Sequence, residues 1–201
     1  MKYIDMKKEN MSIIKKWRRN KMGFDIHGIN PVMREISEDK YPTYHKYHKL
    51  NWGDRIELFR ADSKLEEKYN EEWNLREEEN CGIYFRNNCW WWRPLWNYVC
   101  GSCQDILDED DVEGGSWNDG HQISEAKASA IAKRLFELIN TGDTKGYEDY
   151  HSKPMKDAKE NNKGKKMGDD GYDWNDSYPF SVDNVRNFAQ FCSESGGFEI
   201  C

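Results

Sequence analysis

Six side chains between residues 86 and 93 have the chemistry needed to bind a nucleotide-like anion. They are Arg86, Asn87, Asn88, Trp90, Trp91 and Arg93. Indole rings stack on bases, asparagine amides match a base edge, and an arginine fork holds phosphate oxygens through two hydrogen bonds. An ordinary core segment has little need of so many polar groups, so we expect these six residues to contact a ligand. The alternative is that the tryptophans are core, the asparagines shape a turn and the arginines pair with carboxylates.

Two Asp-x-His pairs could supply acid–base chemistry. The first is Asp25 with His27, and the second is Asp119 with His121, both in glycine-flanked segments. An aspartate can orient an imidazole for proton transfer, and the same groups could bind a ribose or a metal ion. The alternative for the second pair is an Asn-Asp-Gly turn that leads into a helix. No third member of a catalytic set can be named from the sequence.

Four of the six cysteines could form a structural zinc site, namely Cys100, Cys103, Cys192 and Cys201. The first two have the usual spacing for zinc ligands, but the other two lie unusually far apart. A CxxC motif inside a helix is more simply a pair of small buried side chains, so we expect free thiols and no cofactor. The acidic run from residue 105 to 113 lacks the pattern of a calcium loop, and we expect it to be a solvated helix end.

Composition excludes several classes of partner. Asp and Glu exceed Lys and Arg by 37 to 30, so no global positive field would attract duplex nucleic acid or an anionic membrane. No run approaches the roughly 18 apolar residues that cross a bilayer, and residues 1–21 lack the apolar region of a secretory signal. We therefore expect a cytoplasmic protein whose partner is a small ligand or another protein. The oligomeric state is left open.

The hydrophobic pattern predicts a single α+β domain over residues 22–201, preceded by a basic appendage over residues 1–21. Three to four helices should pack on a small, mostly antiparallel sheet. The expected strands are Phe24–Ile29, Arg55–Phe59, Ile83–Phe85 and Phe198–Cys201. Residues 33–47 show no clean period and are interpreted as a loop.

Capping residues predict where the helices begin. We expect helices over residues 63–79, from Pro94, from Ser124 to a stop at Gly142, and from Ser181 onward. If Trp92 and Trp96 join Leu95 on the core side, Trp90 or Trp91 is left to line a groove. The polar stretch 153–176 has almost no aliphatic residues and is expected to be a mobile insertion.

Four blocks of sequence resemble a family of small phage and bacterial proteins that has no assigned activity. The blocks, in order, are GFDIHGINP, GIYFRNNCWWWRPLWNYVCGSC, NDGHQIS and YPFSVDNV with FCSESGGFEIC. The resemblance covers most of the chain from Gly23 onward and implies expression in a host cytoplasm. The residues before Met22 and the polar segment 30–80, with His45 and His48, depart from the family pattern.

From these features we expect a phage-encoded protein that binds a small nucleotide-like anion, such as a signalling nucleotide of host immunity, without turnover. One alternative is a nucleotide-cleaving hydrolase that uses the Asp and His residues. Another is an inhibitor that binds a host protein through the tryptophan and arginine cluster. The chain has no P-loop, Rossmann fingerprint, HExxH or GxSxG motif, which makes several large enzyme classes improbable.

Overall fold

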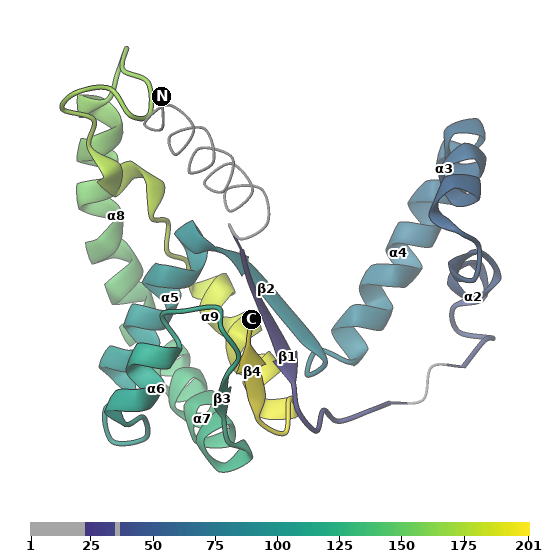
Figure 1. The fold of residues 1–201 in the computed structure, drawn as a ribbon, viewed down its shortest axis with the longest axis horizontal. Helices are drawn as coiled ribbons and strands as arrows, with labels where there is room; N and C mark the ends of the chain where they lie inside the picture. The colour runs from purple at the N-terminus through teal and green to yellow at the C-terminus, as the bar shows by residue number, and fades with distance from the viewer. Residues whose placement is uncertain (1–22, 35–36) are drawn as a thin grey trace, which may run out of the picture.

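The computed structural model describes residues 23–34 and 37–201, so the expected basic appendage lies outside the described residues. Four strands form one antiparallel sheet in the order β2-β1-β4-β3 (Figure 1). They are β1 (Gly23–Gly28), β2 (Tyr84–Asn88), β3 (His121–Ile123) and β4 (Phe198–Ile200). The α+β class and the antiparallel sheet are therefore confirmed. β3 lies where we expected only a turn.

Eight α-helices lie in the described part of the chain, so the expected number of three to four is wrong. They are α2 (Pro42–His48), α3 (Trp52–Ala61), α4 (Ser63–Glu79), α5 (Cys89–Ser102), α6 (Glu109–Gly114), α7 (Glu125–Thr141), α8 (Asp143–Asn161) and α9 (Val182–Glu194), with a short 3-10 turn at Trp174–Ser177. None of these helices is long and apolar enough to cross a membrane.

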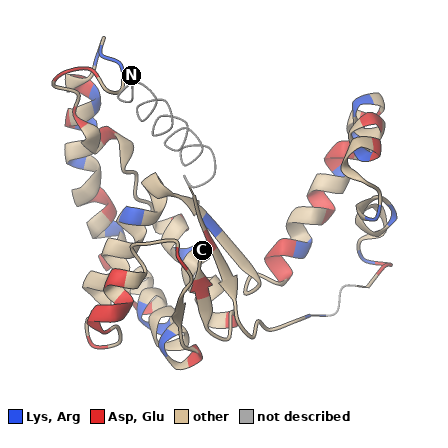
Figure 2. Cartoon of the chain, in the orientation of Figure 1, with Lys and Arg blue, Asp and Glu red and all other residues tan. Residues whose placement is uncertain are grey.

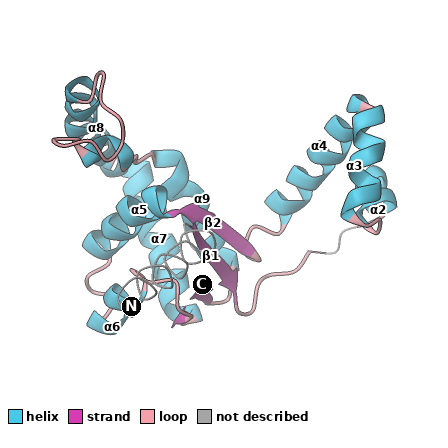
Figure 3. Ribbon diagram, turned by 45° about the horizontal axis from the view of Figure 1, so that its top comes forward, coloured by secondary structure: helices cyan, strands magenta, loops and turns pink. Residues whose placement is uncertain are grey.

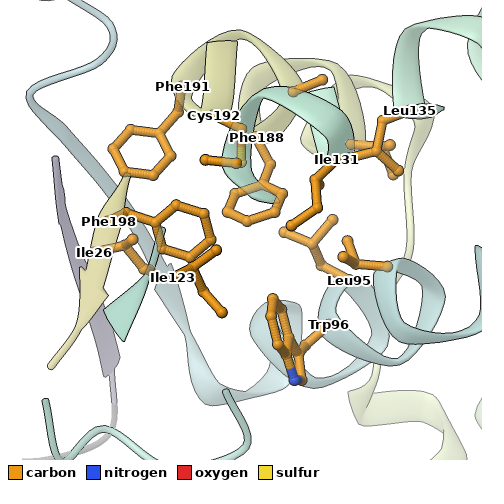
Figure 4. Close-up of a cluster of buried hydrophobic side chains, with 14 of the residues drawn as sticks. Ile26, Leu95, Trp96, Ile123, Ile131, Leu135, Phe188, Phe191, Cys192 and Phe198 are labelled. Carbon is orange, nitrogen blue, oxygen red and sulfur yellow. The ribbon is translucent and has the colours of Figure 1, made fainter. Parts of the chain in front are cut away.

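The core lies between one face of the sheet and helices α5, α7 and α9. Alternate strand residues, including Ile26 and Phe198, are fully buried because successive side chains of a strand point to opposite faces. Figure 4 shows them opposite Phe188 of α9 and Leu95 of α5. The remaining strand residues point to the other face, which we call the open face of the sheet.

Three predicted helix boundaries are confirmed. The Ser124 hydroxyl accepts a hydrogen bond from the backbone N–H of Lys127, and Gly142 ends α7 with a φ of 88°. Ser181 caps α9 in the same way, through the N–H of Asn184 at 3.2 Å. These two helices supply much of the core that packs against the sheet.

Helices α2, α3 and α4 form an arm that projects from the rest of the molecule (Figures 1 and 3). Its own small core is aromatic, with Tyr41, Tyr44 and Tyr69 buried. The predicted strand at 55–59 is wrong because these residues belong to α3, which begins at the cap residue Asn51. The predicted loop over residues 33–47 is also partly wrong, since its last residues form α2.

The polar stretch 153–176 contains more structure than its composition suggested. Its first residues continue α8 as far as Asn161, past Pro154. Asn162 then bridges the following loop, because its side chain accepts from the N–H of Asp173 and donates to that residue's carbonyl, both at 2.8 Å. A polar composition therefore did not prevent a helix here, since α8 is stabilised by contacts with α7 and the 3-10 turn.

Candidate functional site

Helix α5 begins at Cys89, not at Pro94 as predicted. The side chain of Asn88 caps it by accepting hydrogen bonds from the N–H groups of Trp90 and Trp91, at 3.0 and 3.1 Å. Pro94 lies inside the helix, where its missing N–H leaves the carbonyl of Trp90 without the usual helical donor. The Asn88 oxygen, which we expected to contact a ligand, is occupied by this cap.

The three consecutive tryptophans lie on a helix, so their rings point in different directions. Trp92 is completely buried and stacks on Trp96, with 5.4 Å between ring centroids, so these two tryptophans do lie on the core side of α5. Trp90 stacks on Trp174 at 6.1 Å, while Trp91 is half-buried. Trp90 therefore packs against the segment that follows α8.

The predicted ligand residues of β2 point to opposite faces of the sheet. Arg86 lies on the open face, where its side chain is 65% exposed. Asn87 points toward α9 and donates to the side chain of Asn184 at 3.2 Å. The structure therefore separates the three residues. Arg86 and Asn87 are neighbours in a strand and point to opposite faces, and the side chain of Asn88 caps α5.

Arg93 lines a surface hollow of about 270 Å³. The other residues that line it are Trp92, Trp96, Asn97, Ser116 and Trp117. Arg93 and Asn97 are exposed side chains one turn apart on α5, and the indole of Trp117 is 59% exposed. No ion pair of Arg93 occurs among residues 23–34 and 37–201. Its guanidinium is therefore available to an anion.

The loop that carries Trp117 is fixed against the stacked tryptophans. Trp92 Nε1 donates to the carbonyl of Gly115 at 2.8 Å, and Trp96 Nε1 donates to the carbonyl of Val112 at 3.2 Å. A Cβ atom on Gly115 would lie 2.1 Å from the Trp96 ring, so only glycine permits this approach. The buried indoles of Trp92 and Trp96 thus position the exposed indole of Trp117.

Sequence reasoning missed the three polar or aromatic partners of Arg93, which are Asn97, Ser116 and Trp117. The sequence did contain a signal for Trp117. This large ring lies in a run of turn residues, GGSWNDG, which has neither the strand nor the helix periodicity that would predict a buried side chain. An isolated indole in such a turn is exposed unless another element covers it.

The open face of the sheet brings the first Asp-x-His pair together with two residues of β2. The Tyr84 hydroxyl donates to Asp25, whose carboxylate also lies 3.4 Å from Arg86 Nε. Burial, and then the bond to Asp25, raise the pKa of the Tyr84 hydroxyl. The His27 ring lies 5.1 Å from the Tyr84 ring. Asp25 thus contacts Tyr84 and Arg86 in preference to the imidazole.

The second Asp-x-His pair is not a pair in the structure. His121 Nε2 lies 3.1 Å from Asp111, while Asp119 is exposed in the preceding loop. Asp111 is only 4% exposed, closes a capping box at the start of α6 and also contacts Lys127. The acidic run is therefore more than a solvated helix end, because one of its carboxylates is a buried structural partner.

The four cysteines of the possible zinc site do not gather. Cys103 and Cys192 are buried in the core, and burial raises the pKa of the Cys103 thiol to about 12. Cys201 lies beyond β4 and its thiol contacts Glu199 at 3.3 Å, a residue of the open face. Among the described residues, no group of three or more His, Cys, Asp or Glu side chains is placed to hold a metal ion.

Comparison with known proteins gives no guide to which of these two surfaces is functional. No protein-family model, characterised protein or solved structure matches the chain. The two surfaces differ in charge. On the open face Asp25 and Arg86 are in contact, whereas among the described residues Arg93 is the one charged side chain that lines the hollow. The hollow is therefore the better site for an anion.

Proposed function

We propose that this protein binds a small nucleotide-like anion in the hollow beside Arg93. The observation that supports this most strongly is the guanidinium of Arg93, which has no ion pair within the described ranges, next to the exposed indole of Trp117. A planar ring can stack on the indole while a phosphate or carboxylate accepts two hydrogen bonds from the guanidinium. Asn97 and Ser116 add an amide and a hydroxyl for the polar edge of the ring.

We further propose that the ligand is held without turnover. In the part of the chain that the structure describes, the residues that line the hollow include no Asp, Glu, His, Lys, Cys or Tyr, so none of these residues can act as a general acid or base near neutral pH. A volume of about 270 Å³ is at the lower end of small-molecule sites, which favours a compact ligand such as a mononucleotide. The four sequence blocks that resemble phage and bacterial proteins motivate the further proposal that this ligand is a signalling nucleotide of host immunity.

Isothermal titration with a panel of cyclic and ADP-ribose-type nucleotides tests this proposal. We expect at least one nucleotide to bind, and Arg93→Ala and Trp117→Ala each to weaken binding about tenfold or more, since a stacked base contributes roughly 1–3 kcal/mol. Arg60→Ala and Trp52→Ala are matched controls, because both residues are exposed on α3 and far from the hollow. Equal losses in test and control variants, or a panel without binding, would show that the proposal is wrong.

A nucleotide-cleaving hydrolase is the second candidate, and the open face is the observation that favours it. There His27, Asp25 and Tyr84 offer proton-transfer groups beside the guanidinium of Arg86. If this candidate is correct, nucleotides should be cleaved, and His27→Ala should abolish cleavage without changing the affinity that depends on Arg93. Chromatography of nucleotides after incubation with the protein distinguishes the two candidates.

A further inference from the structure

Two adjoining hollows lie where the arm meets the rest of the molecule, between the last turn of α4 and α9. The inner one has a volume of about 420 Å³ and the outer one about 560 Å³. They share Glu78, Cys81 and Gln190 as lining residues, so they form one continuous cleft. Each has the size of a small-ligand site.

The floor of the inner hollow is aromatic. Phe85 of β2 and Phe191 of α9 lie with ring centroids 5.8 Å apart, and Tyr84 lies beside them at the surface. Phe191 is only 1% exposed and Phe85 packs against the main core, so this floor is part of a rigid unit. Phe85 is partly exposed and can contact the apolar part of a ligand without rearrangement, while Phe191 supports it from the core.

The wall of the inner hollow on α4 is acidic. Glu77 and Glu78 line it, and none of the described residues that line the inner hollow is Lys, Arg or His (Figure 2 shows the acidic end of α4). Glu77 already pairs with Arg76 at 2.7 Å, but Glu78 has no ion pair in the part of the chain that the structure describes. A carboxylate beside an aromatic floor favours a cation, which is attracted to both.

The nearby cations are already neutralised. Arg34 forms a two-pronged ion pair with Glu194, in which Nη2 lies 2.6 Å from Oε1, and Lys40 pairs with Glu79. Burial, with the bond to Glu194, raises the pKa of the Cys81 thiol to about 11, so this group is uncharged at neutral pH. Within residues 23–34 and 37–201, the cations that line the cleft, Arg34 and Lys40, are therefore paired with carboxylates other than Glu78.

The turn between α4 and β2 fixes the shape of the cleft. A Cβ atom on Gly82 would lie 2.2 Å from the carbonyl oxygen of Glu194, so the turn packs directly on the last turn of α9. The backbone N–H of Arg34 donates to the side chain of Asn80 at 2.8 Å, which holds the other side of the turn. Such close backbone contact holds the end of α4 against the end of α9.

We propose that the inner hollow binds an organic cation, an ammonium or guanidinium group on an apolar body. Glu78 pairs with the cation, the partly exposed ring of Phe85 contacts the apolar body, and the amide oxygen of Gln190 accepts a remaining N–H. This site is separate from the hollow beside Arg93 and has the opposite charge preference, so it does not depend on the proposed nucleotide function.

NMR titration of the ¹⁵N-labelled protein with 2-phenylethylammonium tests this inference, with 3-phenylpropionate as an anion of matched size. We expect the cation to shift the side-chain amide signal of Gln190 and to bind at least fivefold more tightly than the anion. Glu78→Gln should weaken cation binding three- to tenfold, whereas Glu67→Gln, an exposed glutamate earlier on α4, should not. A blocked dipeptide, acetyl-Phe-Arg-amide, shows whether the natural cation belongs to a peptide or to a free amine. If the dipeptide binds more tightly than 2-phenylethylammonium, the cation is a peptide side chain; if it binds more weakly, the cation is a free amine.

Two results would overturn the inference. One is equal binding of the cation and the anion, which would show that only the aromatic floor attracts ligands. The other is an unchanged affinity in Glu78→Gln, or shifts confined to residues outside the cleft. A failed fold is not a concern for this variant, because Glu78 is exposed and the substitution keeps the shape of the side chain.

Discussion

Trp92 and Trp96 stack within 12° of parallel, and the N–H of each indole donates to a carbonyl at the end of α6. Both rings are buried, whereas Trp117 in the loop that they hold is mostly exposed. The position of the exposed indole therefore depends on the core, and the hollow beside Arg93 should be sensitive to substitutions that never contact a ligand.

Gly115→Ala should destabilise the protein by about 1–3 kcal/mol, because the new methyl group overlaps the Trp96 ring. Gly101→Ala is the matched control, since Gly101 lies near the end of α5 with open space around it and alanine there should be neutral or stabilising by up to about 1 kcal/mol. Urea denaturation measures the stability of the two variants. Similar unfolding midpoints for the two variants would contradict the close approach of this loop.

Asp111→Ala should lower the free energy of unfolding by about 2–4 kcal/mol. The substitution removes a buried carboxylate that closes the capping box of α6 and contacts both His121 and Lys127. Asp110 is one residue earlier and exposed, so Asp110→Ala should change the free energy of unfolding by less than about 0.5 kcal/mol. Thermal denaturation of the two variants distinguishes a structural carboxylate from a solvated one.

The ion pair between Arg34 and Glu194 should contribute to acid stability. The hydrogen bond from Arg34 lowers the pKa of the Glu194 carboxyl below its ordinary value of 4.5. The folded state therefore binds a proton on Glu194 less readily than the unfolded state does. The stability that the ion pair contributes is complete above the ordinary pKa of the carboxyl, and it is lost as the pH falls through the lower pKa of the folded state. In urea titrations below about pH 5, Glu194→Gln should lose less stability on acidification than the wild type. If the stability of Glu194→Gln and of the wild type fell equally with pH, the ion pair would not contribute to acid stability.

Trp174→Ala should expose the segment after α8 to trypsin. The stack of Trp174 on Trp90 joins this lysine-rich segment to α5, so its loss should speed cleavage after Lys163, Lys165 and Lys166 severalfold. Trp52→Ala, which removes an exposed indole from the arm, should leave the rate at these sites unchanged. Mass spectrometry of the digest identifies the sites. Rapid cleavage there in the wild type would instead support the mobile insertion expected from composition.

Local signals predicted the elements that hold the main core. Ser124 and Ser181 are strong caps before periodic apolar runs, and Phe24 with Ile26 alternates as a strand should, so α7, α9 and β1 followed from the sequence. The same rules failed at α5. Pro94 suits a first helical turn, but Asn88 is also a good cap, and the earlier start is favoured because it places Trp92 and Trp96 in the core.

The arm and the candidate site were harder to predict, for a physical reason. The five residues 55–59 fit a strand and a helix equally well, and only contacts with α4, such as Phe59 on Tyr69 at 5.0 Å, select the helix. Similarly, Arg93 meets Trp117 only because α5 and the end of α6 pack together. Contacts between two different elements, even consecutive ones, leave no pattern within either element to detect.

The pairing of β1 with β4, in which Ile26 lies opposite Ile200, has a consequence for synthesis on the ribosome. The arm contains contacts between neighbouring helices and can form as soon as α4 has been translated, but β1 must wait for nearly all later residues before its central partner exists. During this delay the apolar side of β1 is exposed in the nascent chain. We therefore expect the sheet to form after translation of β4, and chaperones that bind unpaired strands to influence the yield of the folded protein.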